Sequence, residues 1–262
     1  MAVVLVTGGA RGIGLAIVQT FADAGHKVMI ADLGDNGGDW NYKLASKEDL
    51  RSAVSIQAGE VASVELDVTQ ADSCVKAITE TLERFGGLDI LINNAGVVDS
   101  GSIAEFNEEE WDRIFAVNAK GIFLMTKAAL SALQESDQAA IINTASIAGK
   151  QGVAKMSAYC GSKFAAIGIT QSLALELADA DITVNAVCPG IVGTAMWLDH
   201  LLPSNFVSTD AQMQNFDQMM ANRIPLGRPQ TAADIADAVL YLATARNVTG
   251  IALTVAGGIQ FN

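Results

Sequence analysis

A tyrosine and a lysine four residues apart are the residues of this sequence best suited to acid/base chemistry. Tyr159 and Lys163 belong to the segment Tyr-Cys-Gly-Ser-Lys, and positions i and i+4 of a helix share one face. A phenol with a pKa of about 10 is a poor acid/base at neutral pH, but a nearby ammonium and a positively charged ring lower that pKa. Ser146, thirteen positions upstream, could hydrogen-bond the reacting oxygen. Together the three residues predict proton transfer at an oxygen-bearing carbon.

A glycine-rich turn near the N-terminus predicts a site for a pyrophosphate. The stretch Thr7–Gly14 reads TGGARGIG; it follows a short apolar run and opens a segment with helical periodicity. Glycines permit a tight turn and let a phosphate approach the backbone at the positive end of a helix. Such a turn is a weak signal alone, but here the strand before it and the helix after it supply the expected context. The predicted contacts are Gly8, Arg11, Gly12, Ile13 and Gly14.

An acidic residue ends the second apolar run, 18 positions after Gly14. Asp32, followed by Leu33, stands where dinucleotide-binding proteins place a carboxylate for the adenosine ribose hydroxyls. A carboxylate there repels the additional phosphate of NADP, and no arginine follows it, although Arg11 could pair with such a phosphate. We therefore predict NAD as the cofactor, with contacts at Asp32 and Leu33.

Two further segments end apolar runs at points where a dinucleotide would lie. The amides of Asn93 and Asn94 could tie strand ends together, and the small Ala95 and Gly96 after them leave room for a flat ring. Asp67 and Val68, at the end of another run, are in position to meet an adenine. The predicted contacts in these segments are Asp67, Val68, Asn94, Ala95 and Gly96.

These residues fall in a regular alternation of short apolar runs and longer segments of helical periodicity. The runs are rich in Val and Ile and apolar at consecutive positions, as in strands buried on both faces. The predicted strands are Val3–Val6, Lys27–Ala31, Val61–Leu66, Ile90–Asn93, Ala140–Thr144, Thr183–Val187 and Ile251–Val255. The predicted helices are Gly14–Ala24, Val75–Phe85, Trp111–Leu133, Tyr159–Leu177 and Ala232–Leu242. The alternation predicts an α/β fold with a doubly wound parallel sheet of about seven strands and helices on both faces.

The 262 residues are expected to form a single domain, 1–262, because no linker, low-complexity tract or internal repeat divides them.

Two stretches interrupt the alternation of strands and helices. Leu33–Lys43 delays a helix that we predict to begin with Ser46 as N-cap, since Ser46 and Asp49 have capping-box spacing. Residues 195–223 hold many apolar side chains and predict a substrate lid, the alternative being an oligomer contact or ordinary packing.

The composition limits the classes of partner. Hydrophobic residues make up 50% and charged residues 17% of the chain, which excludes a largely disordered protein. No apolar run reaches the roughly 18 to 20 residues of a membrane helix, and no signal-peptide pattern is present, so we expect a cytoplasmic protein. A net charge of −13 disfavours nucleic acid and anionic membrane as partners. The 3 widely spaced cysteines and 2 histidines disfavour a disulfide framework or a metal site.

Together these motifs make the whole chain resemble the short-chain dehydrogenases/reductases. The matching motifs, in order, are Thr7–Gly14, Leu66–Thr69, Asn93–Gly96, Asn118, Ser146, the Tyr159/Lys163 pair and Pro189–Met196. The resemblance implies a Rossmann-type fold and a catalytic tetrad of Asn118, Ser146, Tyr159 and Lys163. In the family the tyrosine is the acid/base and the serine orients the substrate. The lysine binds the nicotinamide ribose and lowers the tyrosine pKa, while the asparagine holds a water that feeds protons to the lysine.

The resemblance also implies cofactor contacts at the nicotinamide end and an oligomer. The contacts are Pro189, Gly190, Val192 and Thr194, of which the last two meet the carboxamide. Family members are usually tetramers or dimers that pack the long helices holding Asn118 and Tyr159 against their mates. Those helices are apolar here, so we expect a homo-oligomer, a tetramer rather than a dimer.

The sequence narrows the substrate to a class. Pro189–Trp197 and the GGIQFN tail resemble the branch of butanediol/acetoin and sugar-alcohol dehydrogenases, which oxidise vicinal diols or polyols with NAD. The butanediol enzymes carry Gln after the serine, where Ile147 stands here, which argues against acetoin. The predicted substrate contacts are Ser146, Ile147, Val153, Tyr159, Ile191, Met196 and Trp197, a largely apolar wall that also tolerates alkyl or terpenoid alcohols. Tyr42–Leu50 resembles an insertion of carveol-type members of the family and is expected near the adenosine end.

Other functions stay open beside oxidation of a secondary alcohol or polyol. One is a reductase of terpenoid or cyclic ketones, or of carrier-bound 3-oxoacyl groups. The enzymes that act on carrier-bound groups favour NADPH and need a basic patch, which Asp32 and the net charge of −13 disfavour. The other is a non-catalytic dinucleotide-binding protein, whose mark would be the loss of a tetrad residue; all four are present.

Overall fold

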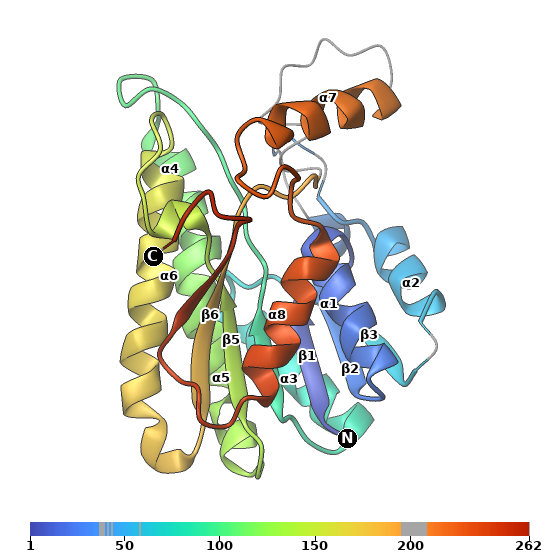
Figure 1. Ribbon diagram of the computed structural model, residues 1–262. Coiled ribbons are helices and arrows are strands. Elements are labelled where there is room, and N and C mark those ends of the chain that lie inside the picture. The colour runs from blue at the N-terminus through green and yellow to red at the C-terminus, as the bar shows by residue number, and fades with distance from the viewer. Residues whose placement is uncertain (37–39, 41, 43, 58, 195–208, 262) are drawn as a thin grey trace.

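The computed structural model describes residues 1–36, 40, 42, 44–57, 59–194 and 209–261. Seven parallel strands form one sheet in the order β3-β2-β1-β4-β5-β6-β7 (Figure 1). The strands are β1 (Val3–Thr7), β2 (Lys27–Asp32), β3 (Val61–Glu65), β4 (Ile90–Asn93), β5 (Ala140–Thr144), β6 (Thr183–Pro189) and β7 (Ala252–Val255). All seven predicted strands are present, and the predicted α/β fold with a doubly wound sheet is confirmed.

Helices cover both faces of the sheet. On one face lie α1 (Gly12–Asp23), α2 (Lys47–Ser55) and α8 (Ala232–Thr244), with α1 and α8 side by side (Figure 1). On the other face lie α3 (Ala71–Phe85), α5 (Gly121–Gln134) and α6 (Ser157–Glu176). The two remaining α-helices in the described part of the chain are α4 (Glu108–Phe115) and α7 (Thr209–Ala221), and α7 lies beyond the carboxyl ends of the strands (Figure 1).

Consecutive apolar residues in the strands serve two cores. Along β1, Val4 and Val6 belong to the cluster beneath α1 and α8, whereas Leu5 belongs to the cluster beneath α3 and α5. Because successive side chains of a strand point to opposite faces, a central strand covered on both faces must be apolar at every position. This arrangement explains why short apolar runs, rather than alternating ones, marked the strands.

The helix after the second strand begins as predicted. The Oγ of Ser46 accepts a 3.2 Å hydrogen bond from the Asp49 N–H, and the Ser46 N–H donates to the Asp49 carboxylate over 2.8 Å. This reciprocal capping box satisfies two backbone N–H groups, those of Ser46 and Asp49, at the start of α2.

The helix predicted over Trp111–Leu133 is not regular. A π-helical turn, η2 (Ala116–Lys120), separates α4 from α5. The predicted helix is present over this stretch, but the π-helical turn within it was not predicted, because apolar periodicity does not distinguish an i→i+5 turn from an α-helical one. Within the described residues, Glu108–Gln134 is also the one stretch long and apolar enough to cross a membrane by length and composition alone; half of its apolar window is buried in the fold.

Candidate active site

A cavity of about 800 Å³ opens at the carboxyl ends of the strands. It lies beside β1 and β4, where the strand order reverses and where open α/β sheets bind their ligands. All the predicted cofactor residues line it, from the glycine-rich turn to Thr194, and so do Ser146, Ile147, Val153 and Ile191. Two predicted substrate residues, Met196 and Trp197, lie outside the described residues.

The glycine-rich turn has the backbone shape that a pyrophosphate site needs. Gly8 and Gly12 adopt φ of +63° and +56°, in the left-handed region that favours glycine. A Cβ at Gly14 would lie 2.0 Å from the Gly8 carbonyl oxygen, so no larger residue fits there. The N-cap residue of α1, Arg11, makes no side-chain capping bond, which leaves the positive end of the helix available to an anion.

Asp32 is held at the end of β2 by two backbone donors. Its carboxylate accepts hydrogen bonds from the N–H groups of Ala10 (3.0 Å) and Leu33 (2.8 Å). Burial raises the pKa of Asp32 above its ordinary value, while these two bonds and the guanidinium of Arg11 oppose the rise. The carboxylate therefore lies on the cavity wall, joined to the loop that carries the glycine-rich turn.

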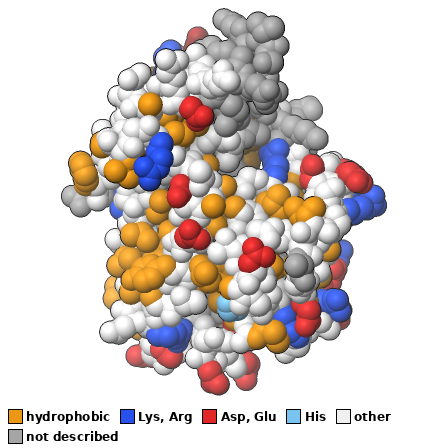
Figure 2. Space-filling view, turned by 45° about the vertical axis from the view of Figure 1, so that its right-hand side comes forward, with side chains coloured by type: hydrophobic (Ala, Val, Ile, Leu, Met, Phe, Trp, Pro, Cys, Tyr) orange, Lys and Arg blue, Asp and Glu red, His pale blue; other side chains and the backbone are white. Residues whose placement is uncertain are grey.

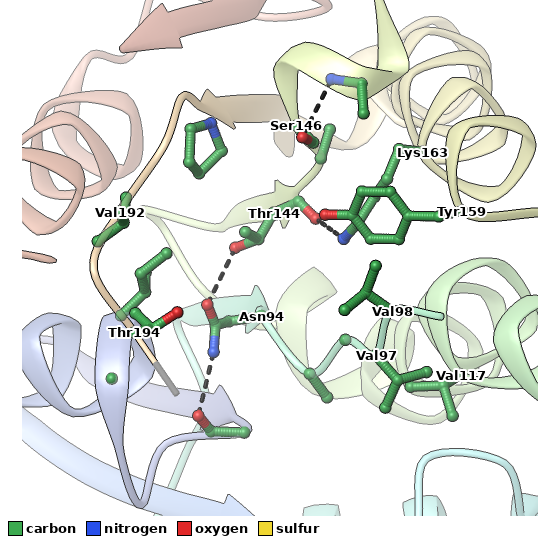
Figure 3. Close-up of a pocket in the computed structure, with 18 of the residues that line it drawn as sticks. Asn94, Val97, Val98, Val117, Thr144, Ser146, Tyr159, Lys163, Val192 and Thr194 are labelled. Carbon is green, nitrogen blue, oxygen red and sulfur yellow. Dashed lines mark hydrogen bonds between the residues drawn. The ribbon is translucent and has the colours of Figure 1, made fainter. Parts of the chain in front are cut away.

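Asn94 ties the ends of three strands together, as its type and place predicted. Its Nδ2 donates to the carbonyl oxygens of Thr7 and Gly8, both over 3.1 Å, and its Oδ1 accepts a 3.3 Å bond from Thr144 (Figure 3). Because β1, β4 and β5 all end here, this one amide holds the floor of the cavity. Asp67 and Val68 line the same cavity and follow the end of β3.

Tyr159 and Lys163 share one face of α6, as the spacing predicted. Both side chains line the cavity, and the Lys163 Nζ lies 5.8 Å from the centre of the Tyr159 ring (Figure 3). The same Nζ donates a 2.8 Å hydrogen bond to the Thr144 carbonyl oxygen. The ammonium is thus anchored to the end of β5, beside the Tyr159 ring.

The pKa of the Tyr159 phenol differs from the expectation. We expected the ammonium of Lys163 and a positively charged nicotinamide together to lower it; in the protein alone, burial raises the pKa of Tyr159 to about 12, and a hydrogen bond from Ser146 only partly offsets that rise. Burial also lowers the pKa of Lys163 to about 8. Removing both groups from water disfavours both charged forms, so burial is the main cause of both shifts.

Ser146 and Asn118 occupy different positions relative to the cavity. Ser146 lines it, at the start of the turn after β5, and its Oγ accepts a 3.1 Å bond from the Ala148 N–H. Asn118 lies behind the wall, in η2 and only 1% exposed. Its Oδ1 accepts from the Val97 N–H and its Nδ2 donates to the Val97 carbonyl, both over 2.8 Å. The Asn118 side chain therefore binds the loop after β4.

The structure adds cavity residues that the sequence did not indicate. At the end opposite the adenosine side, these are Gln151, Met156, Arg223, Ile259 and Gln260. Near the middle, they include Trp40, Tyr42, Val97 and Val98. The segment that includes Tyr42 was expected near the adenosine end, and Tyr42 also reaches the loop after β4. No local pattern reveals Trp40 and Tyr42, since both make contacts with residues distant in sequence.

No metal site is found in the described part of the chain, where no three His, Cys, Asp or Glu side chains come together in a group that could hold a metal ion. The three cysteines, Cys74, Cys160 and Cys188, are buried and free, in keeping with the expected role as small apolar residues. Around Ser146, the candidate acid/base groups are the phenol of Tyr159, the ammonium of Lys163 and the hydroxyl of Ser146.

Comparison with known proteins shows which enzymes this chain resembles. A family model described as short chain dehydrogenase matches residues 2–201. The chain is 38% identical over 261 residues to 2-(S)-hydroxypropyl-CoM dehydrogenase 3 of Xanthobacter autotrophicus, covering 98% of this chain and 96% of that protein. It is 37% identical over 268 residues to L-2,3-butanediol dehydrogenase of Corynebacterium glutamicum, covering 99% of each. The crystal structure of carveol dehydrogenase from Mycobacterium avium in complex with NAD superposes with a TM-score of 0.91 at 26% identity, covering 98% of this chain and 97% of that one.

Proposed function

Because the chain belongs to the short-chain dehydrogenase family, we propose that it is an NAD-dependent oxidoreductase that interconverts a secondary alcohol and its ketone, with Tyr159 as the acid/base. The observation that carries the proposal is that Tyr159, Lys163 and Ser146 line the same cavity as the glycine-rich turn. A cavity with a place for a dinucleotide and a place for proton transfer suits hydride transfer between a cofactor and an alcohol carbon.

We propose that the dinucleotide is NAD, lying along the glycine-rich turn, with Asp32 at its adenosine ribose. The fit is supported by the left-handed backbone of Gly8 and Gly12 in this turn and by the uncapped N-terminus of α1. The complex of the related carveol dehydrogenase with NAD supports the same choice. Val192 and Thr194 would hold the carboxamide end, and bound NAD would supply the carbon that accepts the hydride.

In this proposal each tetrad residue has one task. The phenolate of Tyr159 takes the hydroxyl proton of the alcohol, and the Oγ of Ser146 hydrogen-bonds the same oxygen. Lys163 holds the cofactor ribose and stabilises the phenolate, while Asn118 holds a water that passes protons to Lys163. The pKa of about 12 keeps the phenol protonated at neutral pH, which suits it to donate a proton in ketone reduction. In the oxidation it must first lose that proton, which a positive charge beside it favours.

We propose a secondary alcohol as the substrate, with polyols, sugar alcohols and vicinal diols as the first candidates. Apolar side chains of Ile147, Val153 and Ile191 face the cavity together with the amides of Gln151 and Gln260. Apolar walls with a few polar groups suit a small alcohol with more than one hydroxyl. The names of two relatives, a hydroxypropyl and a butanediol dehydrogenase, support this class.

A screen of NAD reduction tests the proposal. Purified protein is mixed with NAD and polyols, sugars, vicinal diols or terpenoid alcohols, and NADH is followed by its absorbance; the reverse assay uses NADH with the matching ketones. We expect turnover with at least one class. The absence of turnover with every alcohol and ketone, in a protein that binds NADH, would contradict the proposed enzyme and favour a non-catalytic role.

Asp32→Ala should narrow the preference for NAD over NADP. The ratio of kcat/KM for the two cofactors is expected to fall by roughly tenfold, since removal of the carboxylate relieves a repulsion of about 1.4 kcal/mol toward the additional phosphate. Asp72→Ala, at an exposed aspartate on α3, is the matched control. An unchanged ratio would mean that Asp32 does not face the ribose.

We also propose a homotetramer, with single-domain subunits in the cytoplasm. Phe123 on α5 and Phe164 on α6 are 52% and 48% exposed, and they lie on the two helices that we expect to pack against partner subunits. Light scattering after size exclusion is expected to give four times the subunit mass. A monomer at micromolar concentration would contradict this expectation.

On the face shown in Figure 2, basic side chains are scattered among acidic ones rather than gathered into a patch, which fits a small-molecule substrate.

A lid is proposed for residues 195–223, of which 195–208 lie outside the described residues. In the described part, Phe216 and Met220 of α7 are buried against Ile191, a residue of the cavity wall. Arg223 lines the same cavity. A helix that packs on the wall of the substrate end is well placed to cover it.

A further inference from the structure

The segment between β2 and α2 places two aromatic side chains on the wall of the active-site cavity. Trp40 and Tyr42 both line it, and Tyr42 is only 6% exposed. The phenol oxygen of Tyr42 accepts a 3.1 Å hydrogen bond from the N–H of Val98, 56 residues further along the chain. Because a buried N–H requires an acceptor, this bond fixes where the loop after β4 lies.

The loop held by Tyr42 also contacts two of the proposed catalytic residues. The residue before Val98, Val97, exchanges two 2.8 Å hydrogen bonds with the carboxamide of Asn118. A Cβ at Gly96 would lie 3.3 Å from the Lys163 Nζ and 3.4 Å from the Asn118 Oδ1. The loop therefore packs closely against both side chains, and a displacement of a few tenths of an ångström would change the surroundings of both.

From Asn118 the hydrogen bonds continue to the helix that carries Tyr159. The Nδ2 of Asn118 donates to the Oγ of Ser162 over 3.0 Å, and that hydroxyl donates to the Tyr159 carbonyl oxygen over 2.7 Å. Ser162 is fully buried, so these bonds are not exchanged with water. A connected path of hydrogen bonds and backbone thus runs from Tyr42 to the backbone of Tyr159.

Packing of Trp40 and the electrostatic effect of Tyr42 also connect this segment with Tyr159. Trp40 packs against the apolar cluster that contains Val97, and the guanidinium of Arg113 lies 4.2 Å above its ring. In Figure 3, Val97 and Val98 lie close to Tyr159 and Lys163. Burial is the main cause of the raised pKa of Tyr159, and the phenol of Tyr42 adds to the rise. The two phenols are therefore close enough to interact electrostatically.

We propose that Tyr42 is a positioning residue of the active site: its hydrogen bond with Val98 holds the loop after β4 against Asn118 and so sets how Tyr159 and Lys163 meet the substrate. The inference rests on the proposed role of Tyr159 as the acid/base. It assigns the segment between β2 and α2 a part in the chemical step, beyond contact with the adenosine end of the cofactor.

Tyr42→Phe tests the proposal, because it removes the acceptor of the Val98 N–H and keeps the ring that fills the wall. We expect kcat for alcohol oxidation to fall about tenfold, as for a buried donor left without its partner. The Kd of NADH, measured by fluorescence, should change less than about threefold. The deuterium isotope effect on kcat, with the alcohol labelled at the carbinol carbon, should equal or exceed that of the unchanged protein, because hydride transfer is the step that slows.

Two control variants separate positioning from other roles. Tyr241→Phe makes the same change at a tyrosine of α8 that is 54% exposed and outside the cavity, and Trp40→Phe trims the same segment without removing the Tyr42–Val98 bond. The proposal is wrong if kcat of Tyr42→Phe stays within about twofold, if NADH binding weakens in parallel with kcat, or if the isotope effect falls. It is also wrong if Tyr42→Phe and Trp40→Phe lose activity in proportion to their loss of thermal unfolding midpoint. Full activity of Tyr159→Phe would instead overturn the proposed function, whereas an inactive Tyr159→Phe beside a fully active Tyr42→Phe would overturn only the role of Tyr42.

Discussion

Replacing Tyr159 by phenylalanine should lower kcat roughly a thousandfold while the protein still binds NADH. The change removes only the phenol oxygen, and general acid–base groups contribute roughly a hundredfold to ten-thousandfold in rate. The ring that packs on the cavity wall remains, so the cofactor site keeps its shape. Steady-state turnover with the best alcohol of the screen and NADH fluorescence titration measure the two quantities separately.

The control for this variant is Tyr241→Phe, which removes a phenol oxygen from the exposed face of α8. That protein should keep the kcat and the NADH affinity of the unchanged chain. Near-full activity of Tyr159→Phe would mean that another group transfers the proton, and the mechanism proposed for the cavity would be wrong. Loss of NADH binding together with turnover would mean that Tyr159 contributes to cofactor binding more than to chemistry.

Gly14→Ala should have the largest effect on the cofactor site. The added methyl group would lie 2.0 Å from the Gly8 carbonyl oxygen and 2.7 Å from the Asn94 Nδ2, so the turn and the amide that holds the strand ends must both move. We expect a loss of about 2 kcal/mol or more in the free energy of unfolding, in the range of overpacked sites. NADH affinity should fall roughly a hundredfold, because the turn no longer lets a pyrophosphate approach the backbone.

Gly87→Ala provides the matched comparison, since a Cβ at Gly87 meets nothing within 4 Å. Its unfolding free energy should change by less than about 0.5 kcal/mol, and NADH binding should be unaffected. Denaturant unfolding and fluorescence titration of both variants check the pair. Unchanged NADH affinity in Gly14→Ala would show that the dinucleotide does not lie along this turn.

Much of the site was predictable because its residues are linked to local patterns. A tyrosine and a lysine four positions apart must share a helix face, and α6 presents Tyr159 and Lys163 to the same cavity. The glycine-rich turn follows a strand and opens a helix, so its position at the carboxyl ends of the sheet follows from the fold alone. Asn94 could be assigned to the strand ends for the same reason, and its hydrogen bonds agree.

The features that were missed depend on contacts between distant segments. Asn118 was placed in a long helix, as found, but the π-helical turn that holds it and the contact of its carboxamide with Val97 were not predicted. The hydrogen bond between the phenol of Tyr42 and the N–H of Val98 was not predicted either. Neither contact leaves a trace in the spacing of nearby residues, because hydrogen bonds across the fold obey no sequence period.

The order of strands and helices, the turn for a dinucleotide and the pairing of Tyr159 with Lys163 were determined by the sequence itself, because backbone periodicity and glycine conformation act over a few residues. Only the tertiary structure decided how strongly the cavity desolvates Tyr159 and Lys163, and which loop Asn118 and Tyr42 hold. Burial and long-range hydrogen bonding depend on which segments meet in space. The ionisation of the phenol is therefore a property of the assembled cavity, and not of the Tyr159–Lys163 motif.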